Sequence, residues 1–390
     1  MPPSALSAAV RRFPLLGRPR PDCPALPTRV QEITDAVDAA RHKRDRGMAD
    51  AAHALNKAAL IASDAGMTDL ARHLCWQHID SYRNAGRHLT VLEARYLLEP
   101  VLNLARLQIR IDQGAAALSL LEAMFDAVTR SVDLGVDGQT LPLAKLVGEQ
   151  REHRQLRQWV WLQLVGEGTR TLALAGRWDD AAAHAHHHNG IGDHLMEGRQ
   201  ADIIARCLRG DRAEARHLLD ESIRAEPWEH EVACCLQLMC LEPGAQPTGT
   251  ALHAAAAAMR YLAFSRPPGY ASYRARLGLT IATLSNEASR GLATALLNRV
   301  AQDAIVSTDG YAARDVLGFR EPIDGITDNQ RSQLADLASE AGLGVGTLPP
   351  SILHRLTAAT NEAVAVLNAA LTACDRTGTG TAFETKTSTP

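Results

Sequence analysis

The sequence predicts an all-α protein in which helices pair and stack. Over most of its 390 residues, apolar side chains recur with the 3.6-residue period of an amphipathic helix, and no strand-like alternation persists. Glycines such as Gly66, Gly176 and Gly210 interrupt this period where a helix would end, because the residue just beyond a helix often needs a positive φ. Aromatic residues make up only 4% of the chain, and its abundant alanine and leucine favour helices over sheets.

The helices are placed by signals at their ends as well as by their apolar stripes. Acidic residues such as Asp69 and Asp179 follow expected helix starts, where a carboxylate complements the helix dipole. The segment 134–148 carries three glycines and a proline, so we expect it to be an insertion between helices. In order, the predicted helices span residues 29–45, 48–65, 68–84, 90–112, 115–133, 149–175, 178–188, 195–209, 212–224, 228–241, 250–264, 270–287, 290–306, 328–341 and 351–374.

The two ends of the chain lack a helical pattern. Residues 1–28 hold seven prolines and four arginines, and repeated prolines remove the backbone donors that a helix needs. We therefore expect residues 1–28 to form a disordered, basic, proline-rich arm. Residues 376–390 are rich in threonine and glycine without an apolar period, which predicts a disordered tail.

Two segments of the chain repeat one pattern at a distance of 34 residues. In both, a glycine is followed five residues later by an alanine, at Gly176 and Ala181 and again at Gly210 and Ala215. Each glycine follows one predicted helix and precedes a second helix that begins with acidic residues. This pattern resembles the tetratricopeptide repeat (TPR), a helix pair that recurs every ~34 residues. Less regular copies place the corresponding alanines at positions 71 and 117.

The resemblance implies a TPR-like α-solenoid with degenerate repeats over residues 29–242. In TPR proteins the first helix of each pair lines a concave groove that binds peptides or protein segments. The corresponding positions of this chain present cations beside amides, and an arginine can hold a carboxylate at two points. The ligand implied is a protein or peptide segment, with acidic side chains or a terminal carboxylate as candidate contacts. The implied groove residues are His53, Asn56, Lys57, Asn103, Arg106, Arg110, Gln163, Arg170, Glu197 and Gln200.

Residues 250–374 have two interpretations. They continue the stack as further helical repeats, which the shortness of the segment 243–249 favours, or they form a separate helical cap. The glycine- and proline-rich segment 342–350 is expected to be a hinge before the final amphipathic helix, residues 351–374. That last helix either caps the core or occupies the groove until a partner displaces it.

Composition excludes several classes of protein. The formal net charge is −3, so neither nucleic acid nor a membrane surface is expected as a direct partner. Seven scattered cysteines form no C-x-x-C pair, which fits a reducing cytoplasm. No apolar run reaches the ~18 residues of a membrane span, and the N-terminus lacks the apolar core of a secretory signal. We expect a cytoplasmic protein.

A histidine-rich segment offers an alternative chemistry. His184 lies three and four residues before His187 and His188, and such residues share one face of a helix. Together with Asp193 or His194 from the next turn they could bind zinc, nickel or iron. No H-E-x-x-H or comparable motif accompanies them, so solvent-exposed histidines without a metal remain the other interpretation.

The sequence therefore favours a protein- or peptide-binding adaptor or regulatory protein. It contains no nucleophile elbow, dinucleotide fingerprint or phosphate loop, so we expect no catalytic residue and no cofactor. Its bias toward alanine, arginine and glycine is typical of high-GC bacterial genomes, which encode many TPR regulators and accessory proteins of peptide or secondary-metabolite pathways. The alternatives are an all-α metal-dependent enzyme or metal-binding protein centred on residues 184–197, and a scaffold that forms homo-oligomers.

Overall fold

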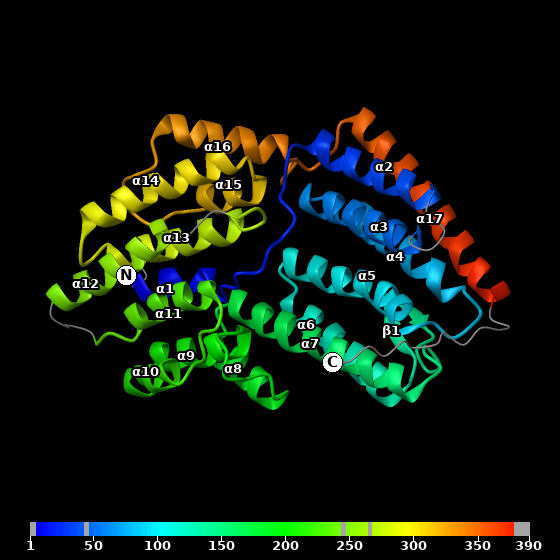
Figure 1. Cartoon of the computed structure of the whole chain (residues 1–390), viewed down its shortest axis with the longest axis horizontal. Coiled ribbons are helices and arrows are strands. Elements are labelled where there is room, and N and C mark those ends of the chain that lie inside the picture. The colour runs from blue at the N-terminus through cyan, green and yellow to red at the C-terminus, as the bar shows by residue number, and fades with distance from the viewer. Residues whose placement is uncertain (1–4, 43–46, 243–246, 264–266, 378–390) are drawn as a thin grey trace, which may run out of the picture.

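A computed structural model of the chain describes residues 5–42, 47–242, 247–263 and 267–377. Over these residues the chain is mainly helical, with one short hairpin, which confirms the predicted all-α class (Figure 1). The helices are α1 (Ala5–Ala9), a 3₁₀ helix η1 (Val10–Arg12), α2 (Leu26–His42), α3 (Gly47–Asp64), α4 (Thr68–Arg83), α5 (Val91–Arg110), α6 (Gly114–Arg130), α7 (Gln150–Leu174), α8 (Trp178–His187), α9 (Glu197–Arg209), α10 (Arg212–Asp220), α11 (Pro227–Met239), α12 (Pro247–Ala263), α13 (Ala271–Ser285), α14 (Arg290–Ser307), α15 (Gly310–Leu317), α16 (Asp328–Glu340) and α17 (Pro350–Thr377).

The helices stack in a repeating order. Each helix from α2 to α15 packs against the next one along the chain, and each odd-numbered helix from α3 to α13 also contacts the next odd-numbered one. The helices α3, α5, α7, α9, α11, α13 and α15 therefore form a continuous row, here called the odd row. This is a helical repeat-like fold, and α12–α16 continue the same alternation beyond the predicted repeats.

Two apolar cores lie along this stack. The first is built from α2–α7 together with α17, and the second from the C-terminal end of α7 through α16. Helix α7 joins them, because Leu164 belongs to the first core and Leu172 to the second. Figure 1 shows the corresponding groups of helices on the right and on the left.

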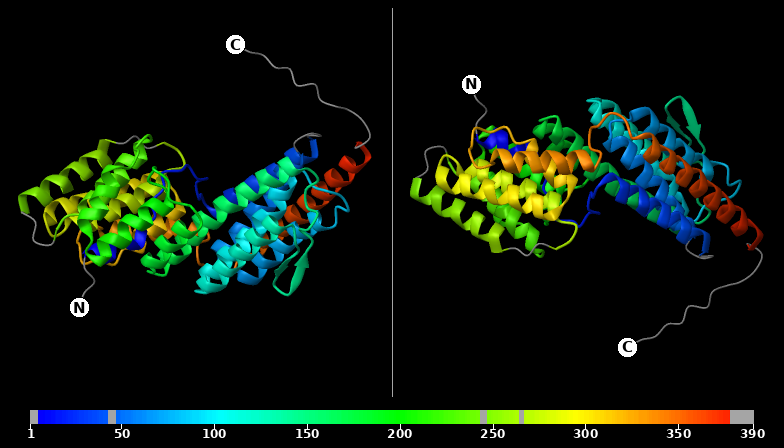
Figure 2. Two further views of the ribbon diagram at one scale, coloured as in Figure 1. Left: turned by 90° about the horizontal axis from the view of Figure 1, so that it is seen from below. Right: turned by 90° about the horizontal axis from the view of Figure 1, so that it is seen from above.

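The two ends of the chain each pack on the distant half of the stack. Helix α17 contacts α2, α3 and α4 and buries Leu356, Ala363 and Leu367 there, whereas α1 contacts α13. In both views of Figure 2 the red C-terminal helix lies with the blue and cyan helices, and the dark-blue helix α1 lies among the green and yellow ones. The final helix thus covers the first core rather than a groove. Residues 378–390 of the predicted tail lie outside the described part of the chain.

The structure corrects the prediction of a disordered arm over residues 1–28. From residue 5 onward this segment is packed, and Phe13 and Leu15 are 0% and 1% exposed. Arg12 forms an ion pair with Glu321 at 2.9 Å. Residues 5–12 and 26–28 of this segment are helical, against the expectation, and only residues 13–25 lack a helix. Apolar side chains between the prolines enter the second core and hold the segment in place. Residues 1–4 lie outside the described residues.

Two local features differ from the helix assignments. The insertion at 134–148 contains a hairpin, in which β1 (Leu134–Val136) pairs antiparallel with β2 (Gln139–Leu141). Its two-residue turn is Asp137-Gly138, both with positive φ, the residue pair that tight hairpins favour. The short helix α15 was not predicted. Its N-cap residue is Asp309, whose side chain accepts a hydrogen bond from the N–H of Ala312.

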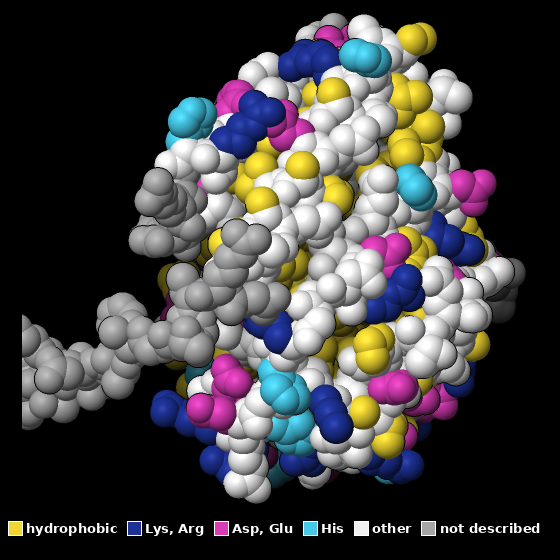
Figure 3. Space-filling view, turned by 90° about the vertical axis from the view of Figure 1, so that its right-hand side faces the viewer, with side chains coloured by type: hydrophobic (Ala, Val, Ile, Leu, Met, Phe, Trp, Pro, Cys, Tyr) yellow, Lys and Arg dark blue, Asp and Glu magenta, His cyan; other side chains and the backbone are white. Residues whose placement is uncertain are grey.

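The surface agrees with the near-neutral charge. On the face that Figure 3 shows, cationic, anionic and histidine side chains are interspersed, without a broad patch of one charge. Among the described residues, no helix combines the length and apolar character needed to cross a bilayer.

Candidate functional site

A cavity of about 450 Å³ lies between α3, α5 and α7, which are consecutive members of the odd row. Apolar side chains, including Leu60, Leu102 and Trp159, form part of its wall. Six of the ten predicted groove residues line it, namely Asn56, Lys57, Asn103, Arg106, Arg110 and Gln163.

Helix periodicity explains why these residues meet. Asn103, Arg106 and Arg110 are three and four residues apart along α5, so they project from one face. Asn56 presents its amide from α3 and Gln163 from α7, the two helices that flank α5 in the odd row.

A chain of polar contacts crosses the cavity wall from α3 to α7. The amide of Asn56 donates to Glu99 at 2.6 Å, and the amide of Asn103 donates to Asn56 at 3.3 Å. Arg106 donates to Asn103 at 3.1 Å and to Glu167 at 2.6 Å. Burial raises the pKa of Glu99. Burial also opposes ionisation of Glu167, but Arg106 and neighbouring cations outweigh it and lower the pKa of that carboxyl.

The cations of the cavity are paired with carboxylates of this chain. Lys57 lies 3.0 Å from Glu32, and Arg110 lies 2.9 Å from the buried Asp64. With Arg106 on Glu167, each predicted cation of the cavity therefore has an internal partner. Sequence reasoning placed these cations in one groove but did not show that the chain itself neutralises them.

The four other predicted groove residues lie outside this cavity. His53 is exposed on α3 and stands edge-on to Tyr96. Arg170 lies 3.6 Å from Glu197, and the Glu197 side chain is nearly buried. Gln200 on α9 is fully buried. Residues 13–23, here called the N-terminal strap, cover the odd row from α9 onward.

The strap is bound along α9, α11, α13 and α15. The N–H of Leu15 donates to Gln200 Oε1 at 2.8 Å, and Gln200 Nε2 donates back to the Leu15 carbonyl at 2.8 Å. Farther along, the N–H of Cys23 donates to Asp309 at 2.8 Å, and the N–H of Gly310 donates to the Cys23 carbonyl at 2.8 Å. Figure 1 shows this dark-blue segment crossing from the left group of helices to α2.

A close approach at Gly17 brings the strap against α11. A Cβ added at Gly17 would lie 2.2 Å from Cβ of Trp228. Only glycine allows the strap backbone to run at this distance from the helix. The strap was missed from the sequence, although the apolar residues Phe13, Leu15 and Leu16 among its prolines are a signal for burial.

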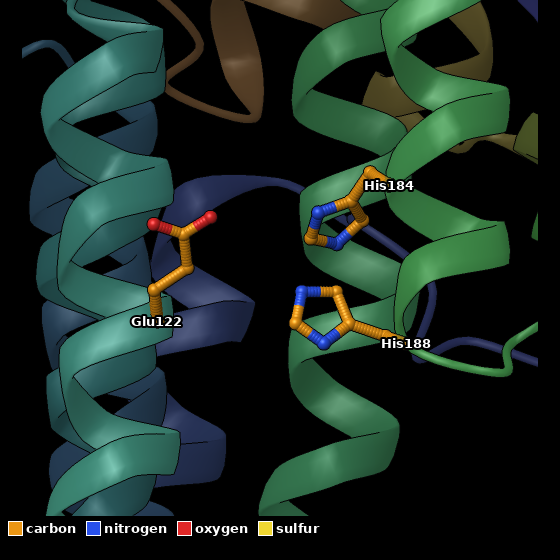
Figure 4. Close-up of side chains that lie close together, drawn as sticks. All are labelled: Glu122, His184 and His188. Carbon is orange, nitrogen blue, oxygen red and sulfur yellow. The ribbon is translucent and has the colours of Figure 1, made fainter.

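The residues of the predicted histidine cluster do not all lie together. His184 and His188 lie beside Glu122 of α6, which the sequence did not associate with them (Figure 4). His194 does not belong to this group, and its Nδ1 lies 3.1 Å from Glu229. Asp193 uses its backbone carbonyl to accept from the N–H of Ile223 at 2.8 Å. Glu122 precedes the histidines by a helix and a hairpin, so no local spacing could have indicated it.

Comparisons with known proteins identify no family. No family model matches the chain, and no curated protein matches it. A solved structure described as a "circular tandem repeat protein with novel repeat topology and enhanced subunit contact surfaces" is similar over 90% of this chain and 86% of its own, with 13% sequence identity and a TM-score of 0.19. At that TM-score the likeness carries no functional argument.

Proposed function

We propose that this chain is a TPR-like adaptor or regulatory protein that binds an extended segment of a partner protein or peptide between α3, α5 and α7. One observation carries the proposal: the odd row already binds a non-helical segment, the N-terminal strap. Gln200 forms hydrogen bonds with both the N–H and the carbonyl of Leu15 in that segment. Asn56, Asn103 and Gln163 present the same carboxamide chemistry in the open cavity. A carboxamide can donate to one backbone group and accept from another, which suits recognition of a main chain.

The cavity also suggests the chemistry of the ligand's side chains. Its apolar wall would take a hydrophobic residue, and Arg106 has a side chain 46% exposed that can exchange Glu167 for an acidic group of the ligand. We propose an acidic or carboxylate-bearing segment as the preferred partner. A cytoplasmic location belongs to the same proposal, since the six described cysteines are free thiols, as in a reducing compartment.

Selection from a random peptide library would test this proposal. Peptides enriched on the wild-type chain are measured by fluorescence polarisation against a variant with Asn103→Ala and Gln163→Ala. Each lost hydrogen bond contributes ~1 kcal/mol, so the double variant should bind about tenfold or more weakly. Raising the salt concentration should weaken acidic peptides more than neutral ones.

The control carries the same two substitution types at Asn368 and Gln333, which are exposed on α17 and α16 away from the cavity. It should bind as wild type does. Enriched peptides that bind the cavity variant and the wild type equally would show that the ligand lies elsewhere, and a library that yields no binder would remove the proposal.

A further inference from the structure

Three side chains of metal-binding type meet between α6 and α8. Glu122 projects from α6, His184 lies in the last turn of α8, and His188 follows directly at its C-cap. Each offers one ligand atom, and these atoms all lie within 4.8 Å of one another. Figure 4 shows both imidazole rings on the side of their helix that faces the Glu122 carboxylate.

The ring of His184 is fixed in position by α7. Its Nε2 lies 3.1 Å from the carbonyl oxygen of Leu164. A carbonyl only accepts, so Nε2 carries the hydrogen and Nδ1 of the neutral ring keeps its lone pair for a metal. The ring also packs directly over Gly168, where an added Cβ would lie 2.3 Å from Nε2. A hydrogen bond from the second ring nitrogen to a carbonyl is typical of metal-bound histidines.

His188 and Glu122 complete the arrangement from its solvent side. The backbone carbonyl of His188 accepts a hydrogen bond from Trp161 Nε1 at 2.7 Å, which anchors the residue. The ring of His187 lies 4.7 Å from that of His188 between centroids. Glu122 is exposed, so a metal ion has a path from solvent.

We propose that Glu122, His184 and His188 form a binding site for a divalent transition metal, with zinc as the best match to two imidazoles and one carboxylate. Zinc–ligand bonds of ~2.0–2.2 Å place ligand atoms ~3.4 Å apart, and rotation of the exposed Glu122 side chain closes the remaining distance. Three protein ligands leave a fourth position for water. The ion would join α6 to α8. This site is separate from the cavity between α3, α5 and α7 and does not depend on the function proposed for it.

Titration of the full chain with zinc chloride by isothermal calorimetry tests the site. We expect one zinc ion per chain and a rise in melting temperature on binding, because an ion that binds only the folded state stabilises it. Glu122→Gln and His188→Ala should each weaken zinc by about tenfold or more, since even residues behind the ligands contribute ~10–100-fold. Magnesium, which prefers oxygen ligands, should not replace zinc.

The matched control is His186→Ala. His186 belongs to the same helix and lies 3.3 Å from Asp202, so it is also an exposed histidine beside a carboxylate, but it lies outside the cluster. Zinc affinity in this variant should equal that of wild type. Equal weakening in all three variants, or wild-type protein that shows no saturable zinc binding, would overturn the proposal. Melting temperatures without zinc show that the variants are folded, and Glu122→Gln alters only an exposed side chain.

Discussion

Gln200 holds the N-terminal strap through two hydrogen bonds to Leu15, so replacing Gln200 should loosen the strap. Gln200→Ala removes three hydrogen bonds at once: those to the N–H and the carbonyl of Leu15, each 2.8 Å long, and one to the carbonyl of Leu195 at 2.6 Å. Leu15 and Leu195 are buried, so their backbone groups would be left without partners where water enters poorly.

The expected cost follows from the number of buried groups that lose a partner. Leaving a buried donor or acceptor unsatisfied costs ~1–3 kcal/mol. Partial entry of water into the space left by the side chain reduces the sum, so we expect a loss of about 3 kcal/mol. Because the strap is held at one end of the chain, the loss should appear first as local opening of the strap rather than as unfolding of the whole stack.

Hydrogen–deuterium exchange measured by mass spectrometry reports this opening directly. A loss of about 3 kcal/mol corresponds to roughly 100-fold faster exchange in the strap, residues 13–23. The matched control is Gln163→Ala on α7, because among the described residues the Gln163 side chain makes no hydrogen bond. Strap exchange in that variant should match wild type. Exchange in Gln200→Ala within about twofold of wild type would refute the reasoning, since it would mean that the two Leu15 bonds contribute little.

Three further outcomes are expected. Burial raises the pKa of Glu231 to about 7, although the hydrogen bond from Tyr273 acts in the opposite direction. Because the pKa is higher in the folded than in the unfolded chain, the free energy of unfolding decreases by ~3 kcal/mol as the pH rises from ~4.5 to about 7. Glu231→Gln should abolish that loss between urea midpoints at pH 5 and pH 8. Burial lowers the pKa of His78 to about 3, so stability falls as the pH drops from ~6.5 toward that value; His78→Leu should flatten this fall, and an unchanged pH profile would contradict it. Gly278→Ala places a Cβ 2.3 Å from Val300 Cγ2; such overpacking costs ~1–3 kcal/mol, and calorimetry should show a lower melting temperature.

The helices and the positions where they end follow from local sequence. Gly66, Gly176 and Gly210 were predicted to lie just past helix ends, and they have φ values of 84°, 72° and 94°. These assignments succeed because a positive φ and an amphipathic period are properties of a few neighbouring residues. Local sequence gives the wrong prediction for η1 and the strap, because their proline content indicated disorder. Their apolar side chains become buried only by contact with helices that are distant in the chain.

For the candidate site too, the sequence predicts which residues share a helix face but not their contacts with other helices. Spacing along α5 places Asn103, Arg106 and Arg110 on one face from sequence alone. Whether those cations are available to a ligand depends on Asp64 and Glu167, which belong to other helices. Sequence reasoning could identify the row of residues but not their charge balance, because ion pairs between helices have no fixed spacing in the chain.

The sequence by itself determined that this chain is all-α and where most of its helices end. Periodicity and glycine conformation are local, so a few neighbouring residues are enough to specify them. Only the tertiary structure decided that the strap fills half of the odd row, that α17 covers the first core, and that Glu122 joins two histidines of another helix. These contacts connect segments far apart in the chain, and burial of apolar surface and pairing of charges become defined only when the helices have packed.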